Sequence, residues 1–322
     1  MPARFASYSV AAALLIRRSP PSDPAAMPGT LPELFADASA GPVVSIEVFP
    51  PKTEAGDDAL RETLTELMPY DPAFVSCTYG AGGSTRTRTL DLCEQLGREF
   101  NVPMTAHFTC VGSSRAELVD WLREAARRGV ANIMALRGDA PDDDGFQIAE
   151  DGLGYAAELV ELIRSEVDEF GIGVAGYPET HPEACDADSD LSFLKAKCDR
   201  GADAIFTQLF YDNDLFYAWR DRCTAAGIEQ PIVPGVMPIT NYARIQRITK
   251  MCGAKFPDSL ASKLEAARDD DLAQMEIGCE FAIRQCRDLL DAGVPGIHFY
   301  ALNKSRACAT ILDALGLSPA VA

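Results

Sequence analysis

One repeated pattern constrains this chain most: a short apolar run rich in β-branched residues, then an amphipathic stretch with helical spacing. Apolar residues three and four positions apart predict helices that bury one face. Gly129, Gly201, Gly227 and Gly293 stand where such helices should stop. The predicted strands are residues 43–49, 74–79, 104–110, 132–137, 172–177, 204–210, 231–237 and 296–301. The predicted helices are 57–68, 85–100, 114–129, 155–170, 189–201, 215–227, 242–252 and 271–293, with an extra helix at 259–267.

Eight alternating strand and helix units predict an α/β protein with a single (β/α)8 TIM barrel over residues 31–322. The alternative is a doubly wound open sheet, but no GxGxxG follows the first strand. Residues 1–30 are predicted to be a disordered tail or a mis-assigned start, with Met27 as the true start. The apolar run at residues 10–16 is too short to span a bilayer, and Arg17 and Arg18 follow it instead of preceding it.

The net charge of −19, from 29 basic and 48 acidic residues, argues against nucleic acid or an anionic membrane as a partner. The ten cysteines include no CxxC pair, which is typical of reduced thiols in a cytoplasmic protein. With three histidines in the whole chain, we expect no metal site. The composition therefore predicts a soluble protein that acts on a small molecule.

Polar side chains occupy most of the predicted strand ends, where barrels of this type carry their catalytic groups. They are Glu47, Thr78, His107, Arg137 with Asp139, Tyr177 with Glu179, Gln208, and Tyr300 with Asn303. In the first strand, Val44, Ile46 and Val48 share one face, so Glu47 should point into the barrel mouth. A desolvated glutamate has a raised pKa and serves as a general acid near neutral pH. The alternative is an edge glutamate that reaches solvent.

Three other features invite a functional interpretation, and each has a plainer alternative. His107 and Cys110 resemble a nucleophile and its base, but positions three apart on a strand face opposite ways, which argues against a thiol hydrolase. Residues 80–84, GAGGS, lie between a strand and a helix and are either an anion cradle or a plain turn. Residues 132–141, NIMALRGDAP, end in Arg137, Gly138 and Asp139, which suit an anionic planar cofactor or a surface turn. Strand parity places Arg137 and Asp139 with Ile133 and Ala135, on a face expected to turn toward the mouth.

Eight stretches, in order along the chain, resemble the methylenetetrahydrofolate reductase family. They are IEVFPPK (46–52), FVSCTYGAGG (74–83), AHFTC (106–110), ALRGD (135–139), GYPETHPEA (176–184), FTQLFYD (206–212), IVPGVMPITNY (232–242) and HFYALN (298–303). The resemblance implies an oxidoreductase of one-carbon metabolism and methionine biosynthesis. Such a flavoprotein reduces 5,10-methylenetetrahydrofolate to 5-methyltetrahydrofolate in a ping-pong cycle in which NADH or NADPH reduces FAD.

The resemblance also implies residue roles. Glu47 matches the general acid that opens the folate ring, and Asp139 matches a carboxylate near the flavin and the pterin. The positions that match FAD contacts are Thr78, Tyr79, Ala81, His107, Arg137, Gly138, Asp139, Tyr155, Ala156, Tyr177, His181, Ala184, Asp190 and Lys197. Gln208, Tyr300 and Lys304 match substrate-binding positions, although Lys304 stands where the family usually has an arginine. Phe193 also replaces a polar residue on the flavin side.

Two other functions compete with this interpretation: a cofactor-free barrel lyase or aldolase, and a barrel subunit that binds a reductase partner without catalysis. The first needs a buried lysine at a strand end, whereas the lysines fall in predicted loops and helices. The presence of Glu47, Asp139 and Gln208 argues against the second. The sequence does not choose between NADH, NADPH and a protein electron donor, and it leaves the oligomeric state open.

Overall fold

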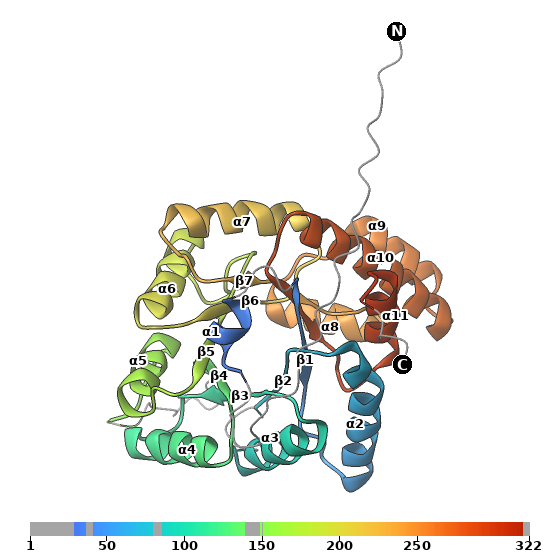
Figure 1. The fold of residues 1–322 in the computed structure, drawn as a ribbon. Coiled ribbons are helices and arrows are strands. Elements are labelled where there is room, and N and C mark those ends of the chain that lie inside the picture. The colour runs from blue at the N-terminus through green and yellow to red at the C-terminus, as the bar shows by residue number, and fades with distance from the viewer. Residues whose placement is uncertain (1–28, 37–40, 80–85, 139–148, 150, 318–322) are drawn as a thin grey trace.

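The computed structural model describes residues 29–36, 41–79, 86–138, 149 and 151–317. Its strands form one sheet in which each pair of neighbours is parallel, and the helices lie around the outside (Figure 1). The strand segments are β1 (Val43–Val48), β2 (Phe74–Cys77), β3 (Met104–Thr109), β4 (Asn132–Leu136), β5 (Gly171–Gly176), β6 (Ala204–Thr207), β7 (Ile232–Val233), β8 (Gly235–Val236) and β9 (Gly296–Tyr300).

The strand order is β7-β6-β5-β4-β3-β2-β1-β9-β8. β7 and β8 stand at opposite ends of this order, yet only Pro234 separates them in the chain. Because β7 pairs with β6 and β8 pairs with β9, the broken seventh strand brings the two ends of the sheet together. The predicted barrel is confirmed, with the seventh strand in two parts. Pro234 has no N–H to donate, but its carbonyl accepts a hydrogen bond from the His298 N–H at 3.0 Å.

All of the predicted helices are present. They are α2 (Glu54–Leu67), α3 (Arg86–Phe100), α4 (Arg115–Arg127), α5 (Ala156–Glu166), α6 (Ala187–Asp199), α7 (Asn213–Ala225), α8 (Tyr242–Cys252), α9 (Asp258–Ala266) and α10 (Asp271–Asp291). The glycines expected at helix ends all have positive φ. The helices that the sequence did not predict are α1 (Leu31–Phe35), the 3₁₀ turn η2 (Met68–Tyr70) and α11 (Arg306–Ala314).

The main hydrophobic core lies between the sheet and the ring of helices. Val44, Ile46 and Val48 of β1 belong to it and are at most 8% exposed, which confirms the predicted outward face of that strand. Cys110 also lies in this core, where burial raises the pKa of its thiol to about 11. His107 faces the barrel interior instead, as its contact with Glu47 shows, so the two side chains are kept apart as parity predicted.

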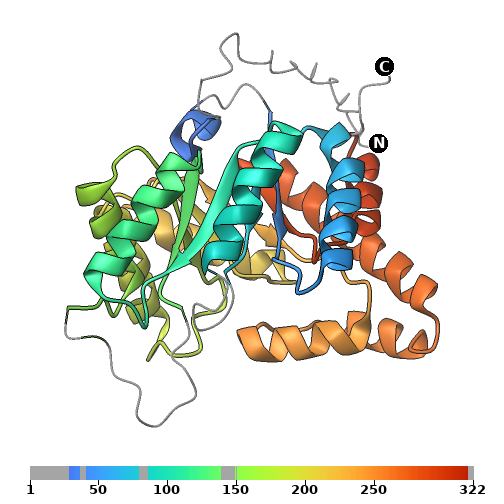
Figure 2. The same cartoon turned by 90° about the horizontal axis from the view of Figure 1, so that it is seen from below.

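The short helix α1 closes the floor of the barrel, at the end opposite to the mouth (Figure 2). Leu31 and Leu34 pack on Phe74 and Phe206 in a second apolar cluster. The Leu31 N–H donates to Asn132 Oδ1 at 2.7 Å, a buried hydrogen bond that fixes α1 to β4. Of the predicted tail, residues 1–28 lie outside the described residues, and Thr30 is the N-cap of α1.

The predicted insertion after α8 contains α9, and it forms a third apolar cluster with α8 and the start of α10. Figure 2 shows α8 on the mouth side of the barrel, away from the floor helix. The insertion contacts the loop after β5, where the Lys255 N–H donates to Glu179 Oε2 at 2.9 Å. Gly278 of α10 packs so closely on this cluster that a Cβ atom there would lie 2.0 Å from the Ile239 carbonyl oxygen. The insertion therefore forms part of the wall around the mouth.

Candidate functional site

Glu47 lies at the end of β1 and points into the barrel, as parity predicted. Its Oε2 atom is 3.1 Å from His107 Nε2 of β3 and 3.4 Å from His298 Nε2 of β9. The His107 contact has an ion-pair distance without hydrogen-bond geometry, and His107 Nε2 has no hydrogen-bond partner within the described part of the chain. Glu47 therefore sits between two imidazoles, and the Nε2 atom of each faces its carboxylate.

His298 was not singled out from the sequence. Its Nδ1 atom lies 2.8 Å from Ser45 Oγ, and its ring stacks on Phe74 with the ring centroids 6.1 Å apart. These contacts fix the ring so that Nε2 faces Glu47. Strand alternation on β9 could have identified His298 from the sequence. Ile297 and Phe299 lie in the outer core, so His298 and Tyr300 must share the inner face.

The electrostatics of Glu47 correct the sequence prediction of a raised pKa. Burial raises the pKa of its carboxyl group, but the attraction of His107 and then His298 outweighs burial and lowers the pKa from its ordinary value of 4.5 to about 2. The error arose because the sequence argument included desolvation and left out the two imidazoles that the barrel brings to the carboxylate. Glu47 is therefore ionised in the unliganded protein at neutral pH.

This lowered pKa predicts a pH dependence of stability. A carboxyl whose pKa is lower in the folded than in the unfolded state stabilises the fold above the unfolded value. Glu47 should therefore contribute up to roughly 3 kcal/mol at neutral pH, and this contribution is lost as the pH falls from 4.5 toward about 2. Urea unfolding of wild type and Glu47→Gln across this acidic range should show their difference in unfolding free energy shrinking. A pH-independent difference would show that the imidazoles do not stabilise the carboxylate.

Tyr300 reaches across the barrel mouth from β9 to β6. Its hydroxyl donates to the Thr207 carbonyl at 2.6 Å, and Gly235 leaves room for the ring, since a Cβ there would lie 2.5 Å from the hydroxyl oxygen. Gln208 follows Thr207, and its Oε1 accepts the Leu209 N–H at 2.8 Å. Gln208 also lines a small cavity of about 10 Å³ together with Tyr177, Pro178, Glu179, Thr180, Leu209, Cys252 and Ala254. The predicted positions Gln208 and Tyr300 are thus both at the mouth.

A second sequence prediction, that Arg137 turns toward Glu47 on one face with Ile133 and Ala135, is wrong. Ile133 and Ala135 lie in the outer core, whereas Met134 belongs to the floor cluster inside the barrel. Parity therefore turns the Arg137 side chain away from Glu47 and toward the loop after β5. Its guanidinium forms an ion pair with Glu183 in the loop after β5, with Nη1 2.7 Å from Oε2. Asp139 and Ala81, which were also predicted, lie outside the described residues.

Arg137 and the loop after β5 form one side of the mouth. Gly138 has a φ of +85°, and a Cβ there would lie 2.8 Å from the Thr109 side chain, so the backbone approaches β3 closely. The rings of Tyr177 and His181 pack edge to face with centroids 4.6 Å apart. The His181 N–H donates to Asp190 at 3.1 Å. The loop is thereby tied to the start of α6.

Other predicted cofactor positions surround this loop. Lys197 of α6 is half-buried and donates to the Ala175 carbonyl, and desolvation lowers the pKa of its ammonium group to about 8. Tyr155 is the N-cap of α5, next to Ala156, and is 61% exposed. Ala184 donates its N–H to the His181 carbonyl. These positions share one side of the mouth with Arg137.

Three predicted positions lie apart from this group. The Thr78 carbonyl accepts the Thr89 hydroxyl at 3.2 Å, which fixes the exit of β2 to α3. Tyr79 turns outward and packs edge to face on Phe108 and Trp121. Lys304 is exposed in the turn after β9. Thr78 and Lys304 therefore belong to the far side of the mouth, and the Tyr79 ring faces the helices.

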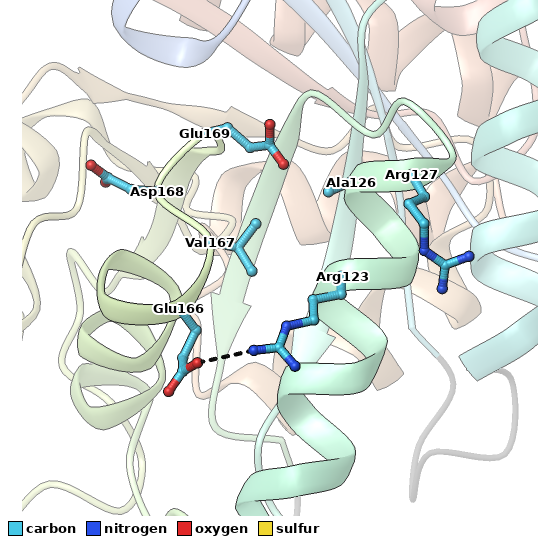
Figure 3. A pocket seen from close by; sticks show the side chains of 7 residues that line it. All are labelled: Arg123, Ala126, Arg127, Glu166, Val167, Asp168 and Glu169. Atoms are coloured by element: carbon cyan, nitrogen blue, oxygen red, sulfur yellow. Dashed lines mark hydrogen bonds and ion pairs between the residues drawn. The ribbon is translucent and has the colours of Figure 1, made fainter.

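A broad depression of about 680 Å³ lies elsewhere, between the C-terminal ends of α4 and α5 (Figure 3). Its lining is largely charged, and Arg123 reaches Glu166 across it at 3.4 Å. It lies on the outside of the helix ring, so it does not include the Glu47 cluster. Among the described residues, no group of three or more His, Cys, Asp or Glu side chains is arranged to hold a metal ion. No described helix is long and apolar enough to cross a membrane.

Comparison with known proteins points to one family. The family model described as methylenetetrahydrofolate reductase matches residues 34–316. The chain is 42% identical over 284 residues to "Methylenetetrahydrofolate reductase (NADH) 1" of Arabidopsis thaliana, covering 85% of this chain and 48% of that protein. It is 36% identical over 279 residues to "5,10-methylenetetrahydrofolate reductase" of Pectobacterium carotovorum, covering 87% of this chain and 92% of the relative.

The chain thus spans about half the length of its plant relatives and nearly all of the bacterial ones. Among solved structures, an uncharacterised Clostridium thermocellum protein that binds two copies of 5-methyl-5,6,7,8-tetrahydrofolic acid has a TM-score of 0.57. The two chains are 13% identical, and the match covers 85% of this chain and 94% of that one. This structural likeness supports the barrel fold alone.

Proposed function

This chain belongs to the methylenetetrahydrofolate reductase family, and we propose that it reduces 5,10-methylenetetrahydrofolate to 5-methyltetrahydrofolate with FAD and a nicotinamide donor. The observation that carries the proposal is Glu47, an ionisable carboxyl held inside the barrel mouth by His107 and His298. A positioned acid that faces a concave site at the carboxyl ends of the strands suits proton transfer to a bound substrate. FAD would supply the hydride, which it takes from the nicotinamide and passes to the folate.

The residues on one side of the mouth suit FAD. His107 Nε2 is buried beside Glu47 Oε2 at 3.1 Å without hydrogen-bond geometry, so the imidazole faces the part of the mouth where a ligand would lie. Arg137 and Lys197 supply positive charge for a pyrophosphate, and the exposed ring of Tyr155 supplies a flat apolar surface. We assign cofactor binding to these residues with Thr78, Tyr79, Ala81, Gly138, Asp139, Ala156, Tyr177, His181, Ala184 and Asp190.

Glu47 is proposed as the proton donor in the reduction of the folate. Protonation of a ring nitrogen helps the five-membered ring to open and exposes the carbon that accepts hydride. Because His107 and His298 keep the free carboxyl ionised, the carboxyl must take up a proton before each such step. A folate that covers the mouth would increase the desolvation of Glu47 and shift its pKa upward, toward the value that a general acid needs.

Gln208, Tyr300 and Lys304 are proposed to bind the folate. Tyr300 pairs with Glu47 in the strand register, and its hydroxyl is fixed by a hydrogen bond to Thr207, the residue before Gln208. Lys304 is exposed beyond β9, where a lysine can neutralise a carboxylate of the folate tail as a point charge. Asp139 is proposed to act on charge at the flavin and the pterin.

Replacing Lys197 with Met is expected to weaken FAD binding by about tenfold or more, because it removes a positive charge from a half-buried position. Fluorescence titration of the apoprotein with FAD measures the dissociation constant. Lys195→Met is the matched control, since Lys195 lies on the same helix and pairs with Asp199 at the surface. Equal FAD affinities in the two variants would remove Lys197 from the proposed cofactor site.

The proposed function is tested by following the two half-reactions separately. Purified protein should be yellow or should take up added FAD, and NADH or NADPH should bleach the flavin. Addition of 5,10-methylenetetrahydrofolate should then restore the colour and yield 5-methyltetrahydrofolate. A colourless protein that takes up no FAD would overturn the proposal.

A further inference from the structure

A row of polar side chains crosses the barrel interior from the mouth to the floor. The strand register pairs Glu47 with Ser76, Ser76 with Thr105, and Thr105 with Asn132. The row begins at Glu47, which faces His107 and His298 at the mouth. It ends at Asn132, whose Oδ1 accepts the N–H of Leu31 in the floor helix. Directly paired residues of neighbouring strands face the same side, so all four side chains lie on the interior face with Glu47.

The middle of this row carries polar atoms without partners. Ser76, Thr105 and Asn132 are each 0% exposed. Ser76 Oγ, Thr105 Oγ1 and Asn132 Nδ2 have no hydrogen-bond partner in the described part of the chain. A buried polar atom without a partner costs about 1–3 kcal/mol, so three in adjacent positions on neighbouring strands require an explanation.

The spacing of the strands indicates what these atoms bind. Neighbouring strands lie about 4.8 Å apart. Hydroxyls on paired residues can reach each other across that gap, but those of Ser76 and Thr105 do not bond each other in the structure. Two hydrogen bonds of about 2.8 Å each through one water molecule span such a gap. A buried water needs two to four polar partners, and each gap along the row offers a polar group on both sides. Water therefore fits the chemistry of the row better than any larger ligand.

We infer that internal water molecules bridge Glu47, Ser76, Thr105 and Asn132, and that this row of waters carries protons to Glu47 from the floor of the barrel. The inference rests on the proposed function, in which Glu47 gives up one proton in every turnover. The water beside Glu47 donates a proton to the carboxylate and takes one from the next water. The last water, at Asn132, takes its proton from solvent at the edge of the floor helix, since Leu31, which bonds Asn132, follows the partly exposed Thr30.

A proton path from the floor supplies Glu47 while bound ligands cover the mouth. A flavin and a folate that cover the mouth keep bulk water away from Glu47 at the moment when its proton is needed. Ser76 and Thr105 provide hydroxyls, which both donate and accept hydrogen bonds and can therefore order waters in either direction of transfer. Their proposed role is to position the waters, since neither side chain contacts the folate.

Thr105→Val and Thr105→Ser form a matched pair. Valine keeps the shape of threonine and removes the hydroxyl, whereas serine keeps the hydroxyl and removes a methyl group. If Thr105 binds water, the valine variant removes one hydrogen-bond partner of that water, and the melting temperature should fall by roughly 2–4 °C. If the site is dry, valine removes an unsatisfied hydroxyl and the melting temperature should rise. A rise would overturn the inference without any measurement of activity.

Stopped-flow measurement of the two half-reactions tests the proton path. Thr105→Val should slow folate reduction about tenfold or more, and Thr105→Ser should stay near wild type. Flavin reduction by the nicotinamide should be unchanged in both variants. Equal folate rates in both variants, with an active wild type, would overturn the proton row and leave the proposed function standing. A wild type that reduces its flavin but not the folate would instead overturn the proposed function.

Discussion

Glu47→Gln is expected to slow reduction of 5,10-methylenetetrahydrofolate by about 10³-fold, while reduction of the flavin by NADH or NADPH stays close to wild type. Gln keeps the size of the side chain and one acceptor oxygen but cannot deliver a proton, and a positioned acid contributes roughly 10²–10⁴-fold. Flavin reduction needs no proton from Glu47, since hydride passes between the two cofactors. Single-turnover stopped-flow of each half-reaction measures the two rates.

The first half-reaction serves as the internal control for this variant. If Glu47→Gln binds FAD in the same amount as wild type and accepts hydride at the same rate, the loss in the second half-reaction is a loss of proton transfer. Equal losses in both half-reactions would contradict the assigned role, because they would indicate a disturbed cofactor site. Retention of full folate reduction would remove Glu47 as the donor.

Gly278→Ala should destabilise the fold by about 3 kcal/mol. A Cβ at this position would lie 2.0 Å from the Ile239 carbonyl oxygen, so α10 and the chain after β8 must separate. The gain in helix propensity from alanine, about 1 kcal/mol, offsets only part of this cost. Thermal unfolding should show a melting temperature lower by roughly 6–12 °C.

Gly97→Ala is the matched control for this prediction. Gly97 also lies within a helix, but the nearest atom to a new Cβ is Met104 Cγ at 3.0 Å, which belongs to a flexible side chain and not to the backbone. Methionine can adjust, so the variant should unfold within a few degrees of wild type. Similar melting temperatures for both variants would show that α10 does not pack tightly on the third apolar cluster, which α8 and α9 form with it.

Much of the fold followed from the sequence because strand and helix periods alternate regularly along it. The break in the seventh strand was visible as Pro234, yet only the register shows that its two parts pair with β6 and β9. α1 was missed because five residues are too few for a helical period to stand out. Its helical conformation depends on Asn132, about one hundred residues away in the sequence, and on the floor cluster.

The site was predicted unevenly for a physical reason. β1 alternates cleanly, so the inward direction of Glu47 could be inferred, whereas β4 is apolar on both faces and gave the wrong face for Arg137. Met134 faces the floor cluster inside the barrel, and alternation carries no signal where both faces are buried. The pKa of Glu47 depends on His298 and His107, which only the closed barrel brings to it.

The central claim is that the mouth of this barrel passes hydride to a folate with a proton from Glu47. The most direct test is anaerobic mixing of the FAD-loaded, nicotinamide-reduced wild-type protein with 5,10-methylenetetrahydrofolate. The account predicts that the flavin is reoxidised and that one 5-methyltetrahydrofolate forms for each flavin. A flavin that remains reduced, with no 5-methyltetrahydrofolate formed, would contradict it.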